Sequence, residues 1–193
     1  MAIIRIKTTW FNKDAGRAND ETASVLALNM WKQASKAVDD ISKADYDIVN
    51  LGRGFGIIAE MSAFMLHIAD RMLYGRVDEA RREGLIAAAG ARLADFVEQN
   101  VRELANDPSS DRDYAGEFLD FLNRRSEDYA TFDFPPDEPN FPVKRYLANA
   151  VRERMEGQDQ MWIIDQVIEF QAPEATATVK KLVDGLYPKA ETA

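Results

Sequence analysis

The chain has 193 residues, of which 46% are hydrophobic and 30% are charged, and its formal net charge is −9. This composition excludes disorder, and the lack of cysteine excludes disulfides, thiolate catalysis and cysteine-based metal sites. A single histidine excludes sites that need two imidazoles, and the acidic balance argues against nucleic acid as a partner.

The sequence also predicts where the chain resides. No apolar run reaches the roughly 20 residues that a helix needs to cross a bilayer. The N-terminal residues lack the basic start, long apolar centre and small-residue cleavage site of a secretory signal. We therefore expect no membrane association and a cytoplasmic location.

The N-terminal stretch AIIRIKTTWF is rich in β-branched and aromatic residues, which favour an extended strand. A lone strand needs a partner. The sequence leaves three alternatives open: this arm pairs with YATFDF at residues 129–134, folds over the rest of the chain, or pairs across an oligomer interface.

Apolar residues at three- and four-residue spacing predict helices along the remainder of the chain. The first begins near Asp20, a good N-cap, and the second ends at Gly75, a good left-handed cap. The apolar stripe of the first helix comprises Leu28, Trp31, Ala34, Val38 and Ile41. We expect helices over about residues 20–45, 56–74, 77–105, 114–129, 140–155, 158–170 and 173–186.

The stretch TFDFPPDEPNFP, residues 131–142, contains four prolines and is therefore expected to be extended and stiff. We expect one helical domain over residues 1–193, with residues 131–141 as the candidate subdivision. The fold class is all-α: a bundle of about six or seven helices with an extended N-terminal arm, in which this crossover brings the last three helices against the first four.

Polar residues occupy one arc of the helix expected over residues 56–74. At 100° per residue, Glu60, His67, Asp70, Arg71 and Tyr74 share this arc, while apolar residues fill the rest of the wheel. The helix is therefore expected at the centre of the bundle. Buried ionisable groups must find partners or shift their pKa, so the arc is the first candidate site.

Three interpretations of this arc are open. The simplest is a polar seam that sets helix register, in which His67 donates to Asp70 or to a carboxylate on a neighbouring helix and Arg71 pairs with Glu60 or Asp70. The second is a metal site with His67, Asp70 and Glu60 as ligands and a divalent metal as the candidate cofactor. His67 and Asp70 share a face, but Glu60 lies seven positions from His67, about 10.5 Å along the axis. The third is acid–base catalysis by His67 with a carboxylate.

A weaker candidate is the stretch NLGRGFG, which places Gly52, Arg53, Gly54 and Gly56 before the expected helix start. Backbone amides at such a start bind anions. No strand precedes it, so a nucleotide fingerprint is absent and a turn or a close helix approach is the simpler interpretation.

Two further features concern the surface. Trp162 falls on the polar side of its expected helix, where a tryptophan either packs beneath a neighbouring segment or lies at the centre of an interface. Four basic residues gather on the preceding helix and form either a solvated face or a docking patch for an acidic partner or subunit: Lys144, Arg145, Arg152 and Arg154.

The sequence does not decide whether the protein is an enzyme. The leading functional hypothesis is protein association, as a homo-oligomer or with another protein, because the helices have broad apolar faces and no convincing catalytic constellation. The alternative is a metal- or small-molecule-binding bundle, or an enzyme, with its pocket at His67, Asp70 and Glu60.

Overall fold

A computed structural model describes residues 16–48, 50–105, 111–135 and 138–188. In these residues the chain forms seven α-helices and one short π-helical segment. They are α1 (Gly16–Lys43), α2 (Leu51–Leu73), α3 (Glu79–Ala105), α4 (Tyr114–Tyr129), α5 (Phe141–Arg152), α6 (Asp159–Gln166), η1 (Val167–Gln171) and α7 (Ala172–Leu186).

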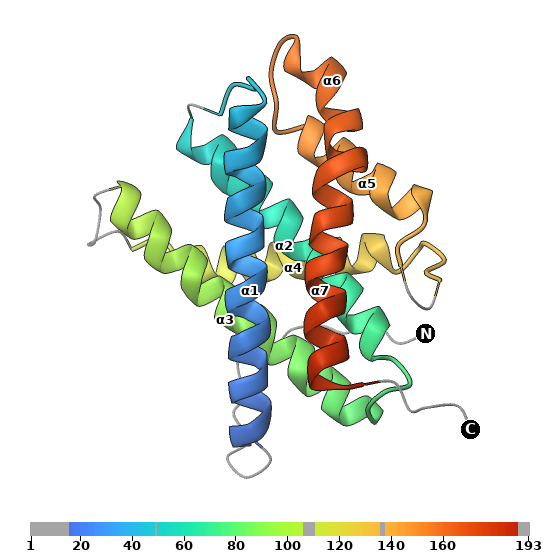
Figure 1. Ribbon diagram of the computed structural model, residues 1–193. Coiled ribbons are helices and arrows are strands. Elements are labelled where there is room, and N and C mark those ends of the chain that lie inside the picture. Colours follow the sequence, from blue (N-terminus) through green and yellow to red (C-terminus); the bar gives the residue numbers. More distant parts are fainter. Residues whose placement is uncertain (1–15, 49, 106–110, 136–137, 189–193) are drawn as a thin grey trace.

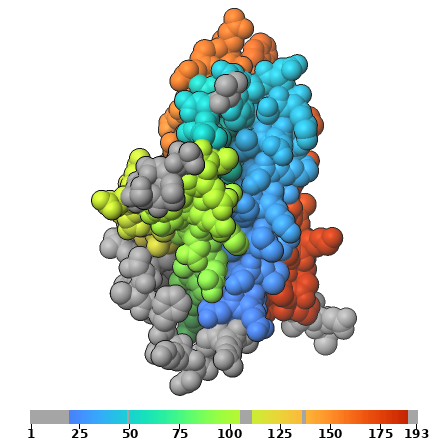
Figure 2. Space-filling view, turned by 90° about the vertical axis from the view of Figure 1, so that its left-hand side faces the viewer, coloured from blue at the N-terminus to red at the C-terminus, as the bar shows by residue number. Residues whose placement is uncertain are grey.

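The fold class expected from the sequence is confirmed: the described residues form an all-α bundle. Helices α1 and α7 lie side by side, and α2 crosses behind both of them (Figure 1). Helices α1 and α3 cover one face of the molecule, with the start of α2 beside them (Figure 2). A single cluster of buried apolar residues receives side chains from every helix.

Helix α2 is the central helix, as its apolar wheel indicates. Most of its residues are buried, including polar Glu60, Ser62 and His67. It contacts α1, α3, α4, α5 and α7. The part of the polar arc around Glu60 and His67 is therefore enclosed by other elements, whereas Tyr74 at its end is exposed. A buried charged group such as Glu60 needs a partner inside the protein.

Two predicted helix starts were wrong. Helix α2 begins at Leu51, because Asn50 is its N-cap and the Asn50 side chain accepts a hydrogen bond from the Gly52 N–H at 2.8 Å. Helix α1 is already formed at Gly16, so Asp20 lies inside it. The predicted end of α2 is confirmed, since Gly75 follows it with a φ of 77°.

The predicted stripe of α1 was also partly wrong. Ala34 and Ile41 are buried as predicted, but Leu28 is 40% exposed. Leu26 and Met30, which the predicted stripe omits, are fully buried. The 28-residue helix packs on α2, α3 and α7 at once, so its buried face is wider than one stripe and is built largely from alanine.

Residues 159–186 form one continuous helical rod instead of two helices with a break between them. The N–H of Ala172 donates to the carbonyl of Val167, five residues back, which defines a π turn. In a straight α-helix the Pro173 ring would clash with the carbonyl four residues before it. We attribute the π turn to Pro173, the residue before which the sequence predicted a break between two helices.

The remaining expectations concern extended segments and membrane spans. Helix α4 ends at Tyr129. Residues 129–134, one of the partners considered for the N-terminal arm, form no strand with any described residue. The N-terminal arm lies outside the described residues. Among the helices that the structure describes, none is both long and apolar enough to cross a bilayer.

Candidate functional site

The centre of the bundle contains an ion-paired cluster around Glu60, whose side chain is fully buried. Arg125 of α4 donates from Nε to Oε2 at 2.8 Å and from Nη2 to Oε1 at 2.7 Å. Arg154, which follows α5, donates from Nη2 to Oε1 at 2.7 Å. One carboxylate therefore joins α2, α4 and the end of α5, and two cations compensate its buried charge.

Tyrosine and aspartate residues extend this cluster. Arg125 also donates to the hydroxyl of Tyr146 at 2.9 Å, and that hydroxyl donates to Asp128 at 2.5 Å. Burial and the hydrogen bond to Asp128 raise the pKa of Tyr146, while Glu60 raises the pKa of Arg125. The raised pKa values keep Tyr146 and Arg125 protonated. The network connects these groups to Glu60, and Arg154 Nε is its one buried donor without a hydrogen-bond partner among the described residues.

The polar-seam interpretation offered Asp70 as a partner of His67, but the His67 ring contacts aromatic rings instead. The ring stacks on Tyr129 with centroids 5.1 Å apart, and Phe134 of the crossover contacts it edge-on at 5.7 Å. Burial, together with the charge of Arg71, lowers the His67 pKa to about 3. His67 Nε2 and the Tyr129 hydroxyl are buried with no hydrogen-bond partner among the described residues.

Asp70 belongs to a second ion-pair group, at the junction of α2 and α3. Its carboxylate accepts from Arg71 at 2.6 Å and from Arg82, which also donates to Glu79 at 2.6 Å. Both arginines lie over the exposed ring of Tyr74, at 5.6 Å from its centroid. Of the two partners that the polar-seam interpretation allows for Arg71, the structure has Asp70.

The structure divides the three proposed metal ligands among three environments. Glu60 faces arginines, His67 faces aromatic rings, and Asp70 faces the arginines at the other end of the arc. Within the described part of the chain, no group of three or more histidine, cysteine, aspartate or glutamate side chains is arranged to hold a metal ion. The metal hypothesis gains no support from this geometry.

The glycine-rich stretch lies in the first turns of α2, not before the helix. The N–H of Gly52 donates to the Asn50 side chain, and those of Arg53 and Gly54 donate to the Asn50 carbonyl. The buried Arg53 guanidinium contacts Asp47 at 3.2 Å and Glu156 at 3.0 Å. The amides and the cation that were expected to bind an anion thus have partners within the chain.

The C-terminal rod presents exposed apolar side chains, which we call the aromatic stripe: Met161, Trp162 and Phe170. Trp162 is 63% exposed, so it does not pack beneath a described segment. Residues eight apart in an α-helix lie about 80° apart around the axis. A π turn contains one residue more than an α turn, so each of its residues advances by a smaller angle around the axis. The angle between Phe170 and Trp162 is therefore smaller than in a regular α-helix.

Helix α5 packs against α6 and η1 and has its own exposed row. Phe141, Arg145 and Arg152 lie within about 40° of one another around the helix axis, and all are exposed. Arg154, predicted to belong to this basic face, instead turns inward to Glu60. The basic group on this helix is therefore divided between the core and the surface.

Sequence reasoning missed the residues that complete the central cluster. Arg125 and Arg154 lie 65 and 94 positions from Glu60, and no local spacing links them. The only available signal was indirect: a buried carboxylate on a central helix requires cations from other helices. No protein-family model, curated protein or solved structure matches this chain.

Proposed function

We propose that this protein acts through protein association as a homo-oligomer, in the cytoplasm, and that the aromatic stripe lies at the interface. The observation that carries the proposal is the exposure of Met161 and Trp162 by 69% and 63% on the first turn of α6, with exposed Phe170 farther along the rod. Adjacent exposed aromatic and methionine side chains are typical of interface centres.

The helix that carries the stripe is held to the rest of the chain by hydrogen bonds and by buried side chains. Asp159, at the start of α6, accepts a hydrogen bond from the Asp47 N–H at 2.8 Å, and Gln160 donates to the Met155 carbonyl at 2.8 Å. On the inner side of the rod, Ile163 and Val167 are fully buried. An apolar face held in this way loses little conformational entropy on binding, which supports an interface role.

The test is light scattering coupled to gel filtration over a wide range of protein concentrations. We expect a mass above that of one chain for the unaltered protein and a shift toward one chain for Trp162→Ser. Leu51→Ser is the matched control, because Leu51 is 54% exposed at the start of α2. A single-chain mass at every concentration would refute the proposal.

The second hypothesis is the ligand site expected at His67, Asp70 and Glu60, of which only the His67 part has support, because arginines already pair with the two carboxylates. The observation that favours it is that His67 Nε2 and the Tyr129 hydroxyl are buried without partners among the described residues, whereas buried polar atoms are nearly always hydrogen-bonded. Metal analysis of untagged protein and of His67→Ala tests it. Stoichiometric metal that disappears with the substitution, while the fold remains, would favour this hypothesis over association alone.

A further inference from the structure

We propose that the partner is a second copy of this chain, and that the two copies pair with α5 of each lying against α6 and η1 of the other. This inference rests on the proposed association and specifies its arrangement. A two-fold pairing brings the same surface of both copies together, so that surface must complement itself. The charges of α5 and the C-terminal rod meet this requirement.

The row on α5 is basic. Arg145 and Arg152 are exposed, and neither forms an ion pair with a described residue. Phe141, on the same row, is 61% exposed. Arginine beside an exposed aromatic ring is the composition that protein interfaces favour.

The rod is acidic where it carries the aromatic stripe. Asp165 and Glu169 are exposed, are one helical turn apart, and lie between Trp162 and Phe170 in the sequence. Neither forms an ion pair with a described residue. Although α5 touches α6 and η1, these acidic groups and the α5 arginines are unpaired with one another, so both sets are available to another molecule.

The net charge of the chain argues for this arrangement over a pairing of other faces. Each copy carries a formal charge of −9, so two copies repel one another in general. An interface that places unpaired arginines of each copy against unpaired carboxylates of the other offsets this repulsion locally. The aromatic side chains of both rows then supply the apolar contact.

The experiment is a charge exchange between two variants. The acidic variant carries Arg145→Glu and Arg152→Glu, and the basic variant carries Asp165→Lys and Glu169→Lys. In the proposed pairing, each variant on its own places like charges opposite one another across the interface. We therefore expect its self-association to weaken by about tenfold or more. An equimolar mixture is fully complementary, because the altered α5 of one meets the altered rod of the other, and we expect mixed dimers.

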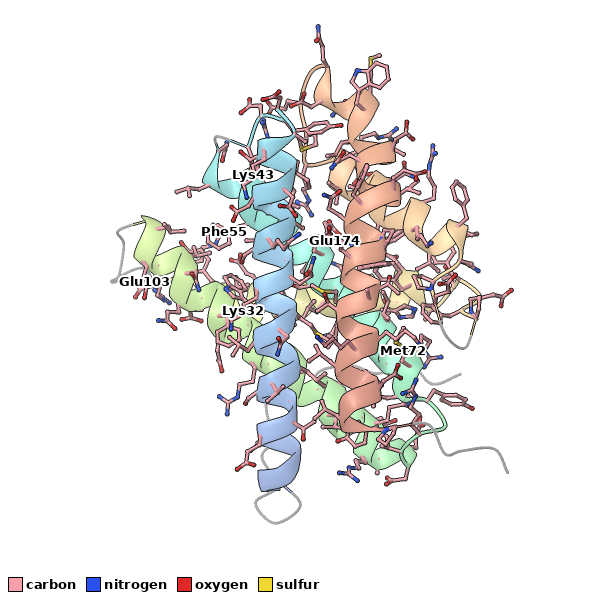
Figure 3. All side chains as sticks on the ribbon, viewed as in Figure 1. Lys32, Lys43, Phe55, Met72, Glu103 and Glu174 are labelled. Carbon is pink, nitrogen blue, oxygen red and sulfur yellow. The ribbon has the colours of Figure 1, made fainter. Side chains whose placement is uncertain are left out.

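The control is Lys32→Glu, which makes the same type of charge change on α1, on the side of the molecule away from α5 (Figure 3). We expect this variant to associate as the unaltered protein does. Circular dichroism melts of all variants check that the helices remain folded.

The outcomes separate the two proposals. If the unaltered protein has the mass of one chain, the proposed association itself fails. If it dimerises and Trp162→Ser weakens the dimer, but the acidic and basic variants behave like Lys32→Glu or do not form mixed dimers, the association stands and the arrangement proposed here is wrong.

Discussion

The two oxygens of Glu60 accept separate hydrogen bonds from Arg125, at 2.8 Å from Nε and 2.7 Å from Nη2. This two-point contact fixes the rotation of α2 relative to α4, because the planar guanidinium accepts few carboxylate orientations. The ring of Phe121 lies 5.3 Å from the Arg125 guanidinium carbon and limits its movement on one side. We conclude that the polar seam of α2 sets helix register through partners on other helices.

Replacing Glu60 with glutamine is expected to destabilise the fold strongly. The substitution keeps the size of the side chain but leaves Arg125 and Arg154 without their shared anion. Removing one partner of a buried ion pair costs about 3 kcal/mol or more of unfolding free energy, although the partial exposure of both arginines reduces this loss. Urea titration followed by circular dichroism measures the change.

The matched control is Glu117→Gln, which breaks the exposed pair of Arg112 and Glu117 at 2.6 Å. An exposed pair contributes about 0 to 1 kcal/mol. Equal losses from Glu60→Gln and Glu117→Gln would contradict the structural role of the buried cluster.

His67 is expected to make the protein sensitive to mild acid. Burial lowers its pKa to about 3 in the folded chain, with a contribution from Arg71, whereas an exposed histidine has a pKa of about 6.5. Between these values the unfolded chain binds a proton that the folded chain does not. The contribution of neutral His67 to the unfolding free energy is therefore complete above about pH 6.5, and below this pH it falls by about 1.4 kcal/mol per pH unit.

The comparison is with His67→Phe, which keeps an aromatic ring against Tyr129 and removes the titrating group. From pH 7.5 to pH 5 we expect the unaltered protein to lose about 2 kcal/mol more unfolding free energy than the variant. His67 is the only histidine, so no other imidazole contributes to the difference. Parallel pH profiles for the two proteins would show that His67 is not buried in neutral form.

The sequence predicted what its local periodicity determines. The apolar wheel of α2 indicated a central helix with buried polar residues, and the helix start expected at Asn140 is confirmed, because the Asn140 side chain caps α5 by accepting from the Val143 N–H. It did not predict the partners of Glu60, because tertiary packing alone brings Arg125 and Arg154 to it. The break expected before Pro173 is absent because a π turn lets a proline remain inside a continuous helix.

Gly54 and Gly56 are expected to respond differently to alanine, although both lie in the first two turns of α2. A Cβ at Gly54 would lie 3.8 Å from Ile48 and 3.9 Å from Val38, which is ordinary contact. Alanine there removes the helical cost of glycine and should raise the unfolding free energy by about 0.5 to 1 kcal/mol.

A Cβ at Gly56 would lie 3.0 Å from Cδ of Arg154, so that side chain must move by a few tenths of an ångström while it is bound to Glu60. Gly56→Ala should therefore stabilise less than Gly54→Ala, or destabilise, because the propensity gain is offset by a weakened ion pair. In an Arg154→Ala background the obstruction is absent, and the two glycine substitutions should have similar effects in thermal and urea unfolding. A difference that persists in that background would show that Arg154 is not the cause and that the close approach of its side chain to α2 carries no energetic weight.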